Sequence, residues 1–202
     1  LTNEILKRIL TIDENRFRLS TFKLPSLTIN KLRKNSKKKS TYASTKIEGN
    51  PLTEEQVESV INSDPHKHLI KPEQEVRNYF LALNVLEEKL EKKELLSLRM
   101  ILDIQAIVEK GAPKNKIGLR GPMPPGFLFA VYDSKSGNAE YIPPEYTEIP
   151  DLLDELVEYV NTTDDHPLII AAVVHYQLVT IHPFEDGNGR TARLISGYIL
   201  DL

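Results

Sequence analysis

Apolar residues recur at helical spacing along most of this 202-residue chain. One stripe occupies residues 76–90, and a second, at 149–160, steps alternately by three residues and by one. A third segment, Leu168–Val179, is apolar nearly throughout, which is typical of a buried helix, and we expect His175 to be a core histidine there. Because residues three and four apart share one face of a helix, the spacing predicts a mainly helical, all-α fold.

Two regions depart from the helical pattern. Lys31–Ser40 is basic and polar, and such a run is typical of a solvated, mobile loop. Phe127–Tyr132 and Ala139–Ile142 are rich in β-prone residues, and they flank a turn-like segment, Asp133–Asn138. We therefore expect a β-hairpin within residues 126–144. A lone hairpin is marginal by itself, so it would serve as a flap or as a surface for another chain's strand.

The composition suits a single globular domain. Hydrophobic residues make up 40% of the chain, charged residues 27%, and the formal net charge is -3, so nothing favours general nucleic-acid binding. The chain has no cysteine, which excludes disulfides and suits a reducing compartment. No apolar run approaches the ~20 residues of a membrane span, and a signal-peptide pattern is missing, so we expect a cytoplasmic protein. The first residue is Leu1 rather than Met, and the sequence stops at Leu202 inside an apolar pattern. We therefore expect a fragment of a longer protein, truncated at the C-terminus.

The stretch Ile181–Arg193, read as IHPFEDGNGRTAR, concentrates the residue types of a phosphate-handling site. His182 is a candidate general base and Asp186 a candidate metal ligand. Both precede a glycine-rich turn, which opens onto an apolar segment with helical character. The N-terminus of a helix directs backbone N–H groups at one point, and that point favours an anion. The residue order matches neither a Walker P-loop nor a Rossmann fingerprint.

The segment HPFEDGNGRTAR resembles the signature of the Fic family, HPFx[DN]GNGRxxR, at every fixed position. The resemblance extends upstream through Ala171–Thr180 and to Tyr141–Pro144, and it covers roughly residue 95 to the C-terminus. It implies a helical Fic fold with a flap hairpin at 126–144 and an active-site loop at 182–193. On this basis we divide the chain into an N-terminal helical region, 1–70, and a Fic core, 71–202.

Most Fic proteins transfer AMP from ATP to a hydroxyl of a target protein, and the resemblance implies the same reaction here. It makes His182 the base that takes the proton of a Ser, Thr or Tyr hydroxyl. Asp186 would hold Mg²⁺ between the α- and β-phosphates. Backbone N–H groups with the Asn188 side chain would form the anion hole, and the arginines would clamp the β- and γ-phosphates. The residues implied to form the ATP site are Phe184, as the core anchor of its loop, with Gly187, Asn188, Gly189, Arg190 and Arg193.

A second motif lies near the N-terminus, at residues 44–50. Its Ser44, Glu48 and Gly49 resemble the inhibitory motif [ST]xxxE[GN] of the same family. The resemblance implies that Glu48 and the γ-phosphate of ATP compete for Arg193. While Glu48 holds that arginine, the α-phosphate would be misplaced for attack, and a misplacement of ~1 Å can cost about a hundredfold in rate. The motif thus implies an autoinhibited enzyme.

The family resemblance also implies a role for the predicted hairpin. In Fic proteins the equivalent flap aligns the main chain of the target beside the active site by strand addition. The flap residues expected to dock the target are Phe129, Ala130, Val131, Tyr141 and Ile142.

Other functions stay open. Glu48 beside a metal could orient a water, in which case the site would hydrolyse an AMP–protein bond. The transferred group could also be UMP, phosphate or phosphocholine. An alternative outside the enzymes is a nucleotide-sensing module of a DNA-binding regulator, because many longer relatives carry a helix-turn-helix domain. Residues 1–202 contain nothing that resembles such a domain. A homodimer is one option, while the target protein, the modified residue type and the adenine pocket cannot be assigned.

Overall fold

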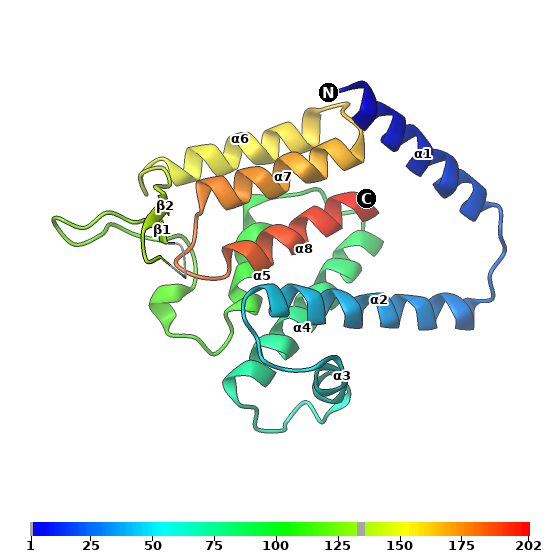
Figure 1. The fold of residues 1–202 in the computed structure, drawn as a ribbon, viewed down its shortest axis with the longest axis horizontal. Coiled ribbons are helices and arrows are strands. Elements are labelled where there is room, and N and C mark those ends of the chain that lie inside the picture. The colour runs from blue at the N-terminus through cyan, green and yellow to red at the C-terminus, as the bar shows by residue number, and fades with distance from the viewer. Residues whose placement is uncertain (1, 133–135) are drawn as a thin grey trace.

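The structure is a computed structural model that describes residues 2–132 and 136–202. The predicted all-α fold with one small hairpin is confirmed (Figure 1). The helices are α1 (Asn3–Ser20), α2 (Ser26–Ile47), α3 (Glu54–Asn62), α4 (Lys71–Glu91), α5 (Leu98–Val108), α6 (Ile149–Thr162), α7 (Pro167–Ile181) and α8 (Asn188–Asp201). One 3-10 turn, η1 (Lys114–Lys116), and two strands, β1 (Val131–Tyr132) and β2 (Ala139–Tyr141), lie between α5 and α6.

The hydrophobic core lies between α4, α5, α6, α7 and α8. Helices α7 and α8 pack along each other, and α6 runs beside α7 (Figure 1). The stripes at 76–90 and 149–160 lie within α4 and α6, as their spacing predicts. The largest fully buried side chains include Tyr79, Met100, Ile104, Leu153, Leu178 and Ile195. Because α7 and α8 flank the signature segment, their packing fixes both ends of that loop.

Helix α7 is buried on one face only, which corrects the expectation of a wholly buried helix. Ala171, Val174 and Leu178 enter the core, whereas Tyr176 is exposed. His175 is only partly buried and lies outside the core. An apolar sequence gives no amphipathic stripe, so its spacing alone cannot tell which face is covered.

The basic run Lys31–Ser40 lies inside α2, so the prediction of a mobile loop is wrong. Lys37 donates to Glu87 on α4 at 2.5 Å, and Lys38 donates to Glu58 on α3 at 3.2 Å. Lysine is a good helix former, and acidic side chains on two neighbouring helices offset the charge of the run. Those partners are distant in sequence, which is why the run by itself looked like a loop.

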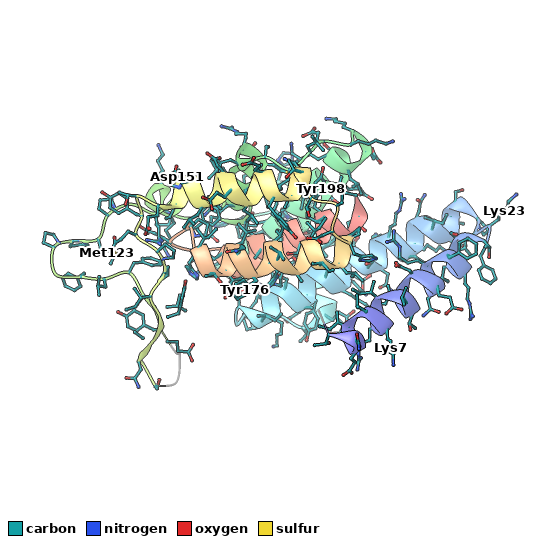
Figure 2. All side chains as sticks on the ribbon, turned by 90° about the horizontal axis from the view of Figure 1, so that it is seen from above. Lys7, Lys23, Met123, Asp151, Tyr176 and Tyr198 are labelled. Atoms are coloured by element: carbon teal, nitrogen blue, oxygen red, sulfur yellow. The ribbon has the colours of Figure 1, made fainter. Side chains whose placement is uncertain are left out.

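Helix α1 contributes no buried residue. Its Asp13 contacts the ring of His166, just before α7, at 3.1 Å. Figure 2 shows α1 and the connection at Lys23 projecting from one end of the core, while the loop with Met123 projects from the other. Within the described ranges, no helix combines the length and the apolar character that crossing a bilayer demands.

The predicted hairpin is present but shorter than the β-prone runs suggested. β1 and β2 pair antiparallel, with Val131 opposite Tyr141 and an irregularity in register at the next pair. Phe127–Ala130 is not strand. Part of the predicted turn, residues 133–135, lies outside the described residues, so the turn itself stays a prediction.

A buried amide joins α4 to the end of α5. The Asn78 side chain donates to the carbonyl oxygens of Val108, at 3.0 Å, and Lys110, at 2.8 Å. Its own oxygen accepts a bond from Gln74 at 2.6 Å. This clamp fixes the backbone on either side of Glu109, whose carboxylate lies in the site described below.

We predict that Asn78→Ala lowers the free energy of unfolding by about 1–3 kcal/mol, because the Val108 carbonyl, in a buried bond, and the Lys110 carbonyl, in a partly buried one, lose their donor. Urea denaturation followed by circular dichroism measures the loss. Asn84→Ala is the matched control, because Asn84 lies in the same helix, is only partly buried and receives one bond from Lys37. Equal losses for both variants would contradict the role given to Asn78.

Candidate active site

Residues 182–187 of the signature segment form a tight loop between α7 and α8, and residues 188–193 are the first residues of α8, so the loop is shorter than the expected 182–193. Phe184 is buried at its centre and pairs with Leu119 in an isolated β-bridge. The Asn188 side chain accepts a bond from the Phe184 N–H at 3.0 Å and donates to the Phe184 carbonyl at 2.8 Å. Gly187 precedes α8 with a φ of 81°, a left-handed conformation that favours glycine. Asn188 therefore closes the loop, and both of its side-chain polar atoms bond to Phe184.

His182 caps the C-terminus of α7 in a left-handed conformation, with φ 48° and ψ 58°. Such a conformation costs about 1–3 kcal/mol in a residue other than glycine, and it persists only where neighbours hold it. The ring Nδ1 lies 3.2 Å from the Val179 carbonyl oxygen, which can only accept, so Nδ1 carries the proton. Nε2 is then the nitrogen that can act as a base.

The environment keeps His182 neutral. Burial lowers the pKa of His182, and the positive charge of Arg120 lowers it further. The bond to Val179 and the charge of Glu48 oppose these effects without reversing them. A neutral imidazole at physiological pH is the form that can remove a proton.

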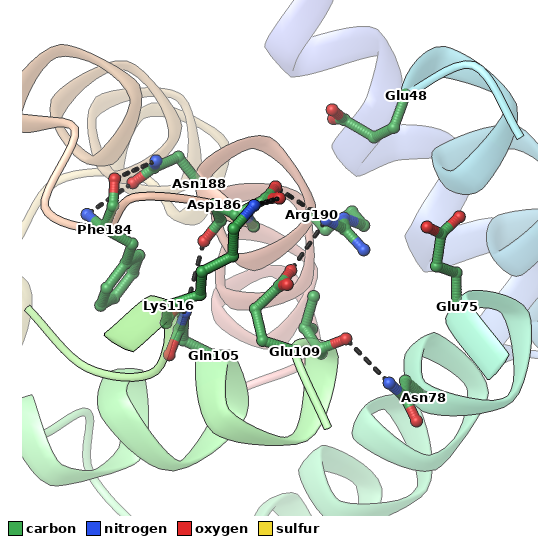
Figure 3. Close-up of polar contacts among 12 residues, drawn as sticks. Glu48, Glu75, Asn78, Gln105, Glu109, Lys116, Phe184, Asp186, Asn188 and Arg190 are labelled. Atoms are coloured by element: carbon green, nitrogen blue, oxygen red, sulfur yellow. Dashed lines mark hydrogen bonds and ion pairs between the residues drawn. The ribbon is translucent and has the colours of Figure 1, made fainter. Parts of the chain in front are cut away.

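A partly buried cluster of charges surrounds Asp186 (Figure 3). Arg190 contacts Asp186 at 3.1 Å and Glu109 at 2.8 Å, and Lys116 contacts the other oxygen of Asp186 at 3.3 Å. Burial would raise the pKa of Asp186, but the Gly187 N–H and the two cations outweigh it and hold that pKa below its usual value. Burial raises the pKa of Glu109, an effect that Arg190 partly offsets.

In this cluster Arg190 contacts carboxylates, whereas the sequence predicted that it would contact phosphates. Its side chain is only 9% exposed and lies between two carboxylates, whereas the side chain of Arg193 is 22% exposed. Arg190 therefore holds Asp186 in place in this structure. Its expected contact with the β- and γ-phosphates stays a prediction.

The residues around Asp186 fit a magnesium ion held by one protein carboxylate. No group of three or more metal-binding side chains occurs among the residues that the structure describes. Mg²⁺ does not require one, because it keeps several waters and binds through one or two carboxylates and substrate phosphates. The Lys116 ammonium at Asp186 already occupies a position that favours a cation.

The N-terminal motif at residues 44–50 meets the signature at Arg193. Glu48 accepts a bond from Arg193 Nη2 at 2.5 Å, and Ser44 Oγ accepts one from Nε at 2.7 Å. The Ser44 carbonyl accepts a third bond at 3.2 Å. Gly49, with a φ of 85°, allows the chain to turn directly after Glu48. Ser44 and Glu48 thus share the guanidinium of Arg193, which lies 145 positions after Glu48 in the sequence.

The start of α8 lies beside this ion pair. The first N–H groups of a helix have no intrahelical acceptor, so they can bind an anion. A Cβ on Gly189 would stand 2.5 Å from a Glu48 oxygen and 3.0 Å from Arg193 Nη1. Glycine at this position leaves room for Glu48 against the helix terminus.

The flap approaches the site through Phe129, whose ring centroid lies 5.9 Å from that of His182. Val131 and Tyr141 form the strand pair, Ala130 is partly buried, and Ile142 is exposed. The structure thus brings His182, the helix terminus and one flap residue together.

Three site residues were not predicted from the sequence, namely Glu109, Lys116 and Arg120. Glu109 follows α5, Lys116 ends η1, and Arg120 lies in a loop between two glycines. The only local signal was the charged Arg120 between Gly118 and Gly121, and it does not reveal a buried position. All three acquire their partners from the signature loop, which is remote in sequence.

Comparison with known proteins agrees with this geometry. Residues 95–200 match the model of the Fic/DOC family. The chain is 28% identical over 199 residues to "Protein adenylyltransferase Fic" of Drosophila grimshawi, covering 96% of this chain and 39% of that protein. It is 28% identical over 207 residues to the protein of the same name in Nematostella vectensis, covering 99% and 45%. The chain therefore spans less than half the length of these relatives.

A solved structure extends the match to the fold. A Fic family protein from Desulfovibrio desulfuricans G20 superposes with a TM-score of 0.78 at 27% identity, covering 99% of this chain and 58% of that one. The family model matches more than half of the chain and includes the whole signature loop. The chain belongs to the Fic/DOC family.

Proposed function

We propose that the protein transfers AMP from ATP to a Ser, Thr or Tyr hydroxyl of a target protein. The observation that carries the proposal is the convergence of His182, Asp186 and the N-terminus of α8 in one loop. The relatives named protein adenylyltransferase support it, since the match covers nearly the whole of this chain.

In the proposed reaction, the phosphates of ATP lie at the N-terminus of α8. His182 Nε2 takes the hydroxyl proton as the hydroxyl oxygen bonds to the α-phosphorus. The bond from the α-phosphorus to the bridging oxygen breaks, and pyrophosphate leaves with the electron pair. Mg²⁺, held by Asp186, would neutralise the charge that develops on the leaving group. The backbone N–H groups at Gly187–Gly189 would stabilise the charge on the α-phosphate.

Autoinhibition is the second part of the proposal. Arg193 is the guanidinium expected to bind the γ-phosphate, and in this structure Glu48 and Ser44 occupy it. ATP bound with its γ-phosphate displaced would present the α-phosphate poorly to the hydroxyl. Movement of α2 away from α8 would release Arg193.

Glu48 also favours a second candidate function. Its carboxylate lies beside the start of α8 and is 39% exposed, so it could orient a water toward an AMP–protein bond. The enzyme would then remove AMP, and loss of Glu48 would abolish activity. Glu48→Gly therefore separates the two functions, because it should raise the activity of an enzyme that transfers AMP and abolish the activity of one that removes AMP.

The remaining expectations depend on the proposed function. We propose that the flap residues align the target main chain, that the magnesium ion binds at Asp186, and that the reaction takes place in the cytoplasm. A homodimer stays a proposal as well, tested by light scattering.

We predict that Glu48→Gly raises AMP transfer by at least about tenfold, because it frees Arg193. Transfer is measured as the mass shift of AMP on protein hydroxyls in lysate supplied with ATP and Mg²⁺. His182→Ala in the same background is the control and should show no shift. Labelling no higher than that of the parent protein would remove Glu48 as the brake.

The stability cost of Glu48→Gly should be small. The ion pair is partly exposed, at 22% for Arg193 and 39% for Glu48, so it contributes only ~0.2–1 kcal/mol. A buried pair would cost ~3–5 kcal/mol, and the exposure rules out that figure here. Thermal unfolding of the same variant checks this estimate.

We predict that the acid limb of the pH–rate profile of Glu48→Gly has its midpoint below 6.5, the usual pKa of histidine. A lowered pKa means that the neutral base persists to more acidic pH, and that the rate falls only as pH drops through the lowered value. Initial rates between about pH 5 and 8 give the midpoint. A midpoint above that usual value would contradict the environment described for His182.

A further inference from the structure

Arg120 is a buried arginine that connects the signature loop to the flap. It is 5% exposed, and it lies in the segment that joins η1 to the hairpin. Its Nε donates to the carbonyl oxygen of His182 at 2.8 Å, and its Nη2 donates to the carbonyl oxygen of Pro144, just after β2. One planar group therefore holds backbone from both sides of the site.

Two more contacts strengthen this connection. The guanidinium carbon lies 4.5 Å from the centroid of the Phe129 ring, which itself faces His182 at 5.9 Å. The backbone N–H of Arg120 donates to the Pro183 carbonyl at 2.8 Å. Arg120 thus contacts the two residues at the start of the signature loop and both arms of the flap.

The backbone of His182 shows why such a contact is needed. Its left-handed conformation is uncommon in a residue other than glycine, and the following Pro183 restricts it further. This conformation directs the imidazole out of α7. It also sets the direction of the His182 carbonyl, whose oxygen accepts the bond from Arg120. Loss of this bond would let His182 relax toward an extended conformation and move the base.

We propose that Arg120 is a positioning residue, which holds His182 in its left-handed conformation and transmits the position of the flap to it. This inference rests on the proposed transferase function. A target strand that orders the flap would, through Pro144 and Phe129, also order the base. Arg120 has no contact with Asp186, Arg190 or Arg193 among the interactions of the described residues.

The guanidinium suits this task because its N–H groups form a rigid fork. A lysine would keep the charge but could not donate to both carbonyls while stacking on Phe129. The charge has a separate effect, since it lowers the pKa of the imidazole. Glu48 acts in the opposite direction, and the Val179 carbonyl binds Nδ1.

The first test is Arg120→Lys in the Glu48→Gly background. We expect kcat for AMP transfer to fall by about tenfold or more, with the KM for ATP unchanged within about twofold. Arg99→Lys is the control, because Arg99 is an exposed arginine of α5 that pairs with Asp103 at 2.9 Å, and it should keep the parent rate. A parent-like kcat in Arg120→Lys, or a loss confined to KM, would overturn the proposal.

The second test is a double-mutant cycle with Phe129→Leu, which removes the ring that joins Arg120 to His182. If the three residues act as one unit, the double variant should lose about as much kcat as Arg120→Lys alone. Losses that multiply would mean independent effects and would exclude coupling through the flap. Should Arg120→Lys be unfolded at the assay temperature, Phe129→Leu decides alone: a fall in kcat supports the coupling, and a parent-like kcat excludes it.

A third readout requires no turnover. An NMR titration of the His182 ring, assigned with His182→Ala, should give a higher pKa in Arg120→Met than in the parent, since a nearby positive charge is removed. An unchanged pKa would contradict the placement of Arg120. If Glu48→Gly transfers no AMP but this pKa rises, the proposed function has failed while Arg120 is still shown to set the state of His182.

Discussion

The ion pair between Arg193 and Glu48 joins the end of α2 to α8 at the candidate active site. It links the residue that ends α2 to the second turn of α8, and in the proposed autoinhibition the arginine does not bind a phosphate while the pair is intact. The pair is partly exposed and contributes little to stability. Its consequence is instead geometric, because it fixes what the more exposed guanidinium of the signature segment contacts. In the proposed function, it thereby determines whether the γ-phosphate of ATP can bind Arg193.

The other charged residues of the site are arranged to stay fixed. Arg190 lies buried between Glu109 and Asp186, and Asn188 closes the loop around Phe184. Arg120 holds the backbone of His182 from the flap side. The site therefore combines a loop held by hydrogen bonds and ion pairs with one arginine for which we propose an exchange of partners. Such a division suits the proposed switch, because a change at Arg193 would leave His182, the proposed base, and Asp186, the proposed metal ligand, in place.

Much of this arrangement could be predicted from local sequence. Apolar spacing predicted α4 and α6, and the signature predicted where His182, Asp186 and Arg193 would lie. Predictions failed where the partner is remote in sequence. The basic run that contains Lys37 and Lys38 was predicted to be a loop, because the acidic residues that pair with these lysines are on α3 and α4. Glu109 and Arg120 carry no local sign of burial, since their partners belong to a loop more than sixty residues away.

The most direct test of this account is the position of Arg193 in crystals soaked with Mg²⁺ and a non-hydrolysable ATP analogue, for the parent protein and for Glu48→Gly. The account predicts that Arg193 binds the γ-phosphate in the variant, with the α-phosphate facing His182 Nε2. In the parent, Arg193 should remain on Glu48, with the γ-phosphate elsewhere. An arginine that binds Glu48 and the γ-phosphate together in the parent, with the same α-phosphate position in both proteins, would contradict the competition.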